Sequence, residues 1–259
     1  MRAADAKSAI DHLPLETEGI VLTGGEVTVV KETLREVAEY VHAVRAERFP
    51  HLKLSMETNG TWVHDQHSAY LGMLELHSWG IDQIIFSGND EAHAQAGLNT
   101  DLIMRGHDSP VSHAAERIAF ELYRLGIPYT PPEFGGAWFH LPLGRALETQ
   151  TDFRNFLPCF HQRSSVREGL TMAVDVDGRL SPCVFGVVPS MGSIFDNDYN
   201  ALMAKALTDP VLGTLMAEGS DKVAEKFGIS LAHDPKETTE DGCVNCISTF
   251  GALKERRII

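Results

Sequence analysis

The chain has 259 residues, of which 43% are hydrophobic and 22% are charged, an ordinary composition for one or two globular domains. It carries 22 Lys and Arg against 36 Asp and Glu, which gives a formal net charge of −14. This excess of acid argues against nucleic-acid and anionic-membrane partners, because both need a basic surface. No segment has the apolar length of a membrane span or the apolar core of a signal peptide, so we expect a cytoplasmic protein.

The first half alternates segments typical of strands and of helices. Alternation at this spacing predicts an α/β fold in which βα units surround a parallel sheet. In the helix that covers 66–79, we expect Leu71, Leu74 and Trp79 to face the core. The strands are expected over 19–23, 52–57, 81–87 and 127–130, and the helices over 4–13, 32–48, 66–79 and 111–125.

Polar turns follow three of these predicted strands. They are Gly24-Gly25-Glu26, Thr58-Asn59-Gly60 and Ser87-Gly88-Asn89-Asp90. Because the carboxyl ends of parallel strands meet at one edge of a sheet, the three turns are expected to form a ligand site there. Each turn also has a simpler interpretation. The first could be a tight strand-to-helix turn with a solvated Glu, and the second a plain turn with Asn in a left-handed conformation.

The second half has a different character. Prolines and glycines interrupt the pattern between 128 and 144, and we place a domain boundary near residue 150, with domains over 1–150 and 151–259. The turn Asp177-Gly178 lies between alternating apolar residues and predicts a hairpin over 170–184. Helices are expected over 200–207 and 210–216, followed by a loop that carries Cys243-Val-Asn-Cys246.

All four cysteines lie in this second half, at Cys159, Cys183, Cys243 and Cys246. A C-x-x-C spacing lets two thiolates bind one metal centre, and four thiolates can complete either a [4Fe–4S] cluster or a Zn²⁺ site. Buried free thiols are the remaining alternative.

Together these motifs resemble those of the radical S-adenosylmethionine (radical SAM) enzymes. The resemblance rests on Leu22-Thr-Gly-Gly-Glu26, Thr58-Asn-Gly60 and Ile85-Phe-Ser-Gly88. It extends to the cysteine tail, which is similar to the twitch or SPASM auxiliary-cluster region. The resemblance implies a partial (β/α) TIM-type barrel that lacks its first strand, followed by a small hairpin-and-helix cysteine module.

The resemblance also implies cofactors and site residues. In the family, the Gly-Gly-Glu turn holds the amino group of the methionine half of S-adenosyl-L-methionine. It implies an auxiliary [4Fe–4S] cluster in preference to zinc on Cys159, Cys183, Cys243 and Cys246. The residues that would bind S-adenosyl-L-methionine are Gly24, Gly25, Glu26, Asn59 and Ser87.

The implied reaction is cleavage of S-adenosyl-L-methionine to a 5′-deoxyadenosyl radical, which abstracts hydrogen from a peptide or small-molecule substrate. Such an oxidoreductase needs a low-potential electron donor as a partner. No residue is singled out as the catalytic acid or base.

One expected motif is missing. The family binds its catalytic [4Fe–4S] cluster with C-x-x-x-C-x-x-C, yet none of the 23 residues before Gly24 is a cysteine. Either the given sequence is truncated and a second cluster belongs to an upstream extension, or the protein is a non-catalytic Fe–S or zinc-binding scaffold. We favour truncation, because the later turns keep chemically suitable residues together. A barrel without its first strand is also expected to leave a sheet edge exposed.

Overall fold

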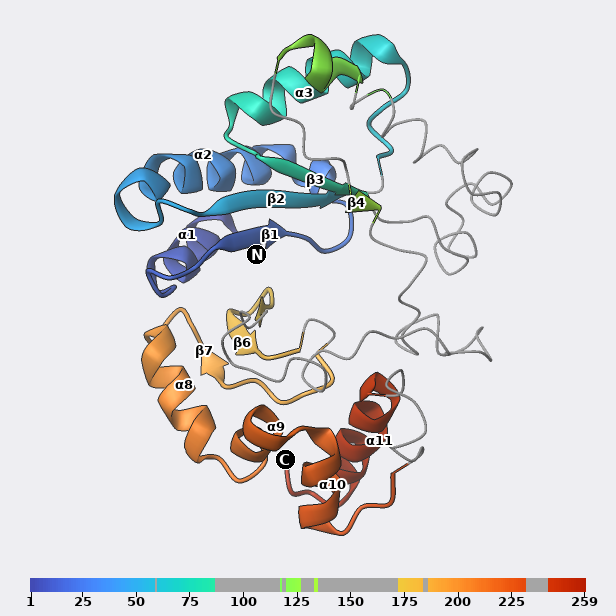
Figure 1. Cartoon of the computed structure of the whole chain (residues 1–259). Coiled ribbons are helices and arrows are strands. Elements are labelled where there is room, and N and C mark those ends of the chain that lie inside the picture. The colour runs from blue at the N-terminus through green and yellow to red at the C-terminus, as the bar shows by residue number, and fades with distance from the viewer. Residues whose placement is uncertain are drawn as a thin grey trace, which may run out of the picture. The chain divides into compact units, whose positions relative to one another are not determined.

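The computed structural model describes residues 1–58, 60–86, 117, 120–126, 133–134, 172–183, 186–231 and 242–259 (Figure 1). It divides into two compact units. The N-terminal unit comprises Arg2–Ile10 and Leu15–Ala137, and the C-terminal unit comprises Met1, Asp11–Pro14 and Trp138–Ile259. The boundary expected near residue 150 lies outside the described residues.

The N-terminal unit is built on a parallel sheet whose strands follow one another in chain order. The strands predicted over 19–23, 52–57 and 81–87 are confirmed. A fourth strand begins only after two prolines, while the segment 127–130 lies outside the described residues. The described strands do not close into a barrel, and β1 forms one edge of the sheet. The strands are β1 (Gly19–Leu22), β2 (Lys53–Thr58), β3 (Gln83–Phe86) and β4 (Glu133–Phe134).

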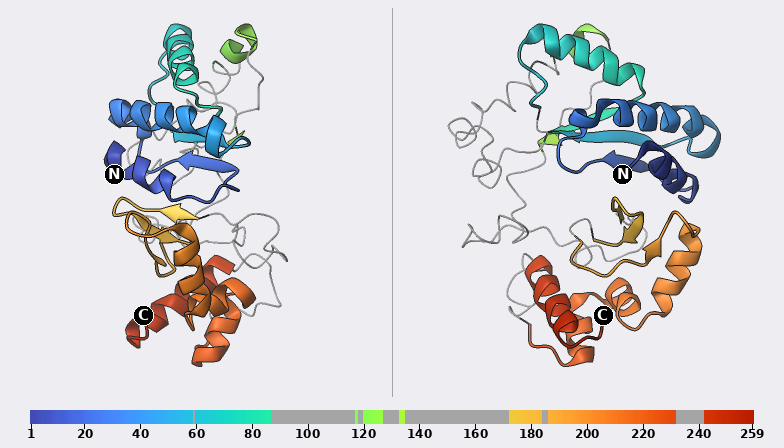
Figure 2. Two further views of the ribbon diagram at one scale, coloured as in Figure 1. Left: turned by 90° about the vertical axis from the view of Figure 1, so that its left-hand side faces the viewer. Right: turned by 180° about the vertical axis from the view of Figure 1, so that it is seen from behind.

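The helices of this unit are α1 (Ala3–Asp11), α2 (Lys31–Arg48) and α3 (Gln66–Ser78). Seen from behind in Figure 2, α1 and α2 lie over the same face of the sheet. In α2 the helical period brings Leu34, Val37 and Val41 into the core. Residues 120–124 are also helical, within the helix predicted over 111–125.

The buried face of α3 differs from the prediction. Leu71 and Leu74 were expected inside, but they are 50% and 37% exposed, and the helix buries Ala69, Met73 and Leu76 instead. Both sets repeat at helical spacing, so periodicity alone did not distinguish them. Trp79, at the end of the helix, is buried as expected.

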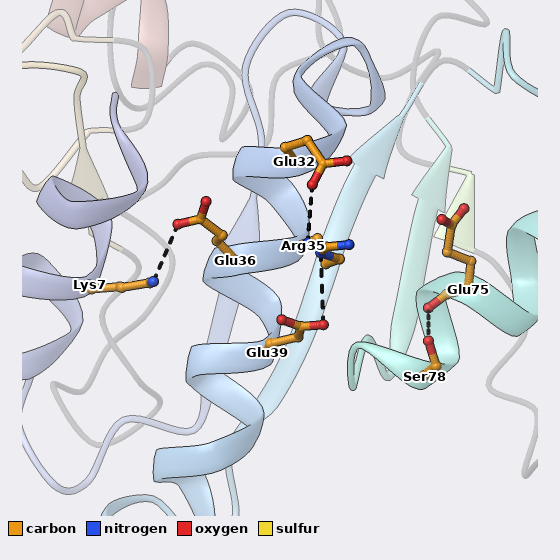
Figure 3. A network of polar contacts seen from close by, with 7 residues as sticks. All are labelled: Lys7, Glu32, Arg35, Glu36, Glu39, Glu75 and Ser78. Atoms are coloured by element: carbon orange, nitrogen blue, oxygen red, sulfur yellow. Dashed lines mark hydrogen bonds and ion pairs between the residues drawn. The ribbon is translucent and has the colours of Figure 1, made fainter.

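Charged side chains form ion pairs between α1 and α2 and within α2 (Figure 3). Lys7 of α1 contacts Glu36 of α2 at 3.5 Å, and Arg35 lies between Glu32 at 3.2 Å and Glu39 at 3.9 Å. These pairs are largely exposed, so each contributes at most about 1 kcal/mol. Burial of apolar residues is therefore the main force holding the helices on the sheet.

The C-terminal unit begins its described part with a small antiparallel sheet, in the order β5-β6-β7. Its strands are β5 (Ala173–Val174), β6 (Arg179–Ser181) and β7 (Gly192–Ser193). The predicted hairpin is confirmed, although its strands are shorter than 170–184 allows. The Asp175 carboxylate accepts the N–H groups of Asp177 and Arg179, each at 2.9 Å, which closes the turn.

The described part of the C-terminal unit continues with four helices. The helices α8 (Tyr199–Thr208) and α9 (Leu212–Glu218) confirm the predicted ones, whereas α10 (Ser220–Phe227) was not predicted. The last helix, α11 (Gly242–Glu255), contains Cys243 and Cys246, so their prediction in a loop was wrong. Just beyond α11, Arg256 donates to the carbonyl oxygens of Phe227 at 2.8 Å and Gly228 at 3.2 Å. This contact connects the ends of α10 and α11.

None of the helices in the described ranges is both long enough and apolar enough to cross a membrane.

Candidate functional site

The turn after β1 exposes its backbone. Gly24 and Gly25 have φ angles of +107° and +56°, which favour glycine because a side chain would strain the backbone. A methyl group at either position would meet no atom of the described residues within 4 Å. Among the described residues, therefore, no side chain covers this stretch of backbone.

Glu26, which ends this turn, is half-buried and held by three hydrogen bonds to one carboxylate oxygen. Oε1 accepts from the Thr28 N–H at 3.1 Å, the Thr28 hydroxyl at 2.6 Å and the Thr58 hydroxyl at 2.8 Å. The first of these bonds caps the short helix η1 (Val27–Val30). The strand-to-helix turn of the simpler interpretation is present, and its Glu is half-buried and hydrogen-bonded.

Thr58, at the end of β2, connects this turn to the next one. Its side chain is fully buried, and besides donating to Glu26 it accepts the Gly60 N–H at 3.1 Å and the Trp62 indole N–H at 3.2 Å. The loops after β1 and β2 therefore meet through hydrogen bonds at the carboxyl edge of the sheet, which the sequence predicted only from strand order.

A second pair of side chains crosses between the same two loops. The hydroxyl of Thr23 donates to Oε2 of Glu57. The two crossing pairs are therefore alike: each joins a threonine hydroxyl to a glutamate carboxylate, and each spans the gap between β1 and β2. Thr23 and Glu57 were not among the predicted site residues. A hydroxyl and a carboxylate at adjacent strand ends are the signal that could have indicated them.

Trp62 lies in the loop after β2 and connects Thr58 to α3. A methyl group on Gly72 of α3 would lie 2.2 Å from Cζ3 of the Trp62 ring, so the indole packs directly on the glycine backbone. This close contact needs glycine at position 72, even though glycine disfavours helices. The sequence contained no local sign that a residue of the loop would pack there.

Of the predicted cofactor residues, the structure places Gly24, Gly25 and Glu26 in one turn. Asn59 and Ser87 lie outside the described residues. Their immediate neighbours Thr58 and Phe86 end the adjacent strands β2 and β3.

The predicted metal ligands fall in the C-terminal unit. Cys183 is half-buried just after β6; its N–H donates to Ser181 Oγ at 3.2 Å, and its carbonyl accepts the Gly186 N–H at 3.1 Å. Cys246 is half-buried on α11. Cys159 and the side chain of Cys243 are outside the described part. Within that part no three possible ligands form a metal-binding group.

The helical position of the C-x-x-C pair still suits a common centre. Residues three apart on a helix share a face, so Cys243 and Cys246 occupy neighbouring positions on α11. One turn further along, the fully buried Thr249 hydroxyl has no hydrogen-bond partner among the described residues. Thiolates are the donors that Fe–S clusters and Zn²⁺ share, so the donor set fits either.

No protein-family model and no curated protein matches the chain.

Proposed function

We propose that the chain binds S-adenosyl-L-methionine at the loops after β1 and β2, as the radical SAM enzymes that it resembles do. The observation that carries this proposal is the open Gly24–Gly25 turn, whose Glu26 carboxylate is tied to the end of β2. Glycine backbone lets the ligand approach, and the carboxylate offers an acceptor to an ammonium group. Asn59 and Ser87 would complete the site from the next two strands.

The cysteines supply the second part of the proposal. Cys159, Cys183, Cys243 and Cys246 would hold an auxiliary [4Fe–4S] cluster in the region after residue 150, and a further cluster would require an upstream C-x-x-x-C-x-x-C. When bound, these groups supply one-electron chemistry for hydrogen abstraction. The protein would be a cytoplasmic enzyme built from a partial TIM-type barrel and a cysteine module. Its substrate would be a peptide or a small molecule, and a low-potential electron donor would reduce the enzyme.

The alternative is a non-catalytic Fe–S or zinc-binding scaffold. One observation favours it: Glu26 Oε1 caps η1 and accepts a hydrogen bond from Thr58, so the Glu26 side chain already has a structural role. In that case the turn would keep its shape without any ligand.

Binding of S-adenosyl-L-homocysteine tests the proposal, because this stable analogue keeps the amino acid and the nucleoside. We expect saturable, stoichiometric binding to the wild-type chain and at least about a tenfold loss of affinity in Glu26→Gln, which removes a charged acceptor. The matched control is Glu32→Gln, an exposed carboxylate on α2. Absence of wild-type binding, or equal affinities in all three proteins, would contradict the proposal.

Anaerobic reconstitution with iron and sulfide separates the cluster from zinc. About four irons per chain are expected, with most of the iron lost in Cys246→Ala and none lost in Ser248→Ala on the same helix. Stoichiometric zinc without iron uptake would contradict the cluster.

A further inference from the structure

The direction of the Thr58 hydrogen bonds is fixed by its neighbours. A hydroxyl has one proton to donate and two lone pairs that accept. The backbone N–H of Gly60 and the indole N–H of Trp62 can only donate, and both point at Thr58 Oγ1. The single hydroxyl proton is therefore left for Glu26 Oε1, at 2.8 Å.

We propose that Thr58 is the positioning residue that aims the Glu26 carboxylate at the ammonium group of the ligand. This inference rests on the proposed function. Thr28 also binds Glu26 Oε1, but it belongs to the same turn and moves with it. Thr58 is the one of these two partners that belongs to the sheet, so it fixes the carboxylate relative to β2.

The support for Thr58 continues into α3. The Trp62 ring packs on Gly72, so the indole N–H has little freedom to leave the Thr58 hydroxyl. Thr58 is fully buried, and water does not compete for its hydrogen bonds. A chain of contacts therefore runs from α3 through Trp62 and Thr58 to Glu26.

Two probes separate positioning from general damage. S-adenosyl-L-homocysteine carries the ammonium group, whereas 5′-methylthioadenosine carries the same nucleoside without the amino acid. In Thr58→Val, which keeps the shape but removes the hydroxyl, we expect affinity for S-adenosyl-L-homocysteine to fall at least about tenfold and affinity for 5′-methylthioadenosine to change less than about twofold. The conservative variant Thr58→Ser should restore the wild-type ratio of the two affinities.

A second variant keeps the test decisive if Thr58→Val does not fold. Trp62→Phe removes one donor and frees a lone pair on Thr58, so the hydroxyl proton is no longer forced towards Glu26. We expect a loss of about two- to fivefold for S-adenosyl-L-homocysteine alone.

The possible failures are distinguishable. If the wild type binds S-adenosyl-L-homocysteine tightly but the folded variants lose both probes equally, or lose neither, Thr58 does not position Glu26 and the proposed function stands. If the wild type binds neither probe, the proposed function fails and the inference fails with it.

Discussion

The two units each contain a glycine turn with left-handed backbone, and the two turns differ in what lies over them. Gly25 has a φ of +56°, and no described atom lies within 4 Å of a methyl group placed there. Gly178 has a φ of +76°, but a methyl group would lie 2.5 Å from the Phe195 ring. The Asp177-Gly178 turn is thus a packed part of a hairpin, whereas no described residue covers the backbone of the turn after β1. A positive φ alone does not tell these cases apart.

The largest expected effect comes from adding a methyl group to the covered turn. Gly178→Ala should destabilise the C-terminal unit by about 2–5 kcal/mol, because backbone strain adds to overpacking against Phe195. Gly25→Ala should cost only the strain, about 1–2 kcal/mol. Urea denaturation measures the free energy of unfolding of each variant, and hydrogen exchange shows which unit is destabilised.

The Phe195 ring provides the control for this pair. In a Phe195→Ala background, Gly178→Ala should cost no more than Gly25→Ala does in the wild type, since the overpacking is gone. Equal costs of the two glycine substitutions in the wild type would mean that the turn after β1 is covered too.

The second prediction concerns α3, the helix on which Trp62 packs. Leu76→Ala should cost about 2–4 kcal/mol, because Leu76 is 5% exposed, whereas Leu71→Ala should cost within about 0.5 kcal/mol at 50% exposure. Thermal or urea unfolding of the two variants decides between the observed face and the predicted one. A larger cost for Leu71→Ala would restore the face expected from the sequence.

The smallest expected effect is at the start of α3. The backbone N–H and hydroxyl of Ser68 hold the pKa of the Asp65 carboxyl below its ordinary value. A lowered pKa stabilises the fold above the ordinary carboxyl pKa of about 3.9, and that contribution is lost as the pH falls through the folded-state pKa. The effect is small because Asp65 is exposed and screened by water.

Asp65→Asn isolates this charge, since Asn also caps helices well. The stability difference between wild type and variant should shrink as the pH is lowered from about 5 to about 2. A difference that stays constant over this range, measured by hydrogen exchange within α3, would show that the charge contributes nothing.

Much of the local structure followed from the sequence. Three of the four predicted strands, the helices α1 and α2 and the Asp177-Gly178 hairpin are in place, because period and turn chemistry are local properties. The inward face of α3 could not be predicted in this way, since Leu71 and Leu74 form a stripe as regular as that of Met73 and Leu76.

In the candidate site too, local features were predictable and long-range contacts were not. The open backbone of Gly24 and Gly25 was predictable from the residues themselves. The bond from Thr58 to Glu26 joins residues 32 positions apart and depends on how β1 and β2 pair, so no local pattern contains it. Cys243 and Cys246 were expected in a loop, yet α11 includes them.

Hydrogen–deuterium exchange with S-adenosyl-L-homocysteine tests most directly whether the two loops form one ligand site. Saturating ligand should slow exchange together in peptides that cover residues 22–30 and 56–63, while the hairpin around Gly178 stays unchanged. Protection of neither loop, or protection confined to other parts of the chain, would contradict the account.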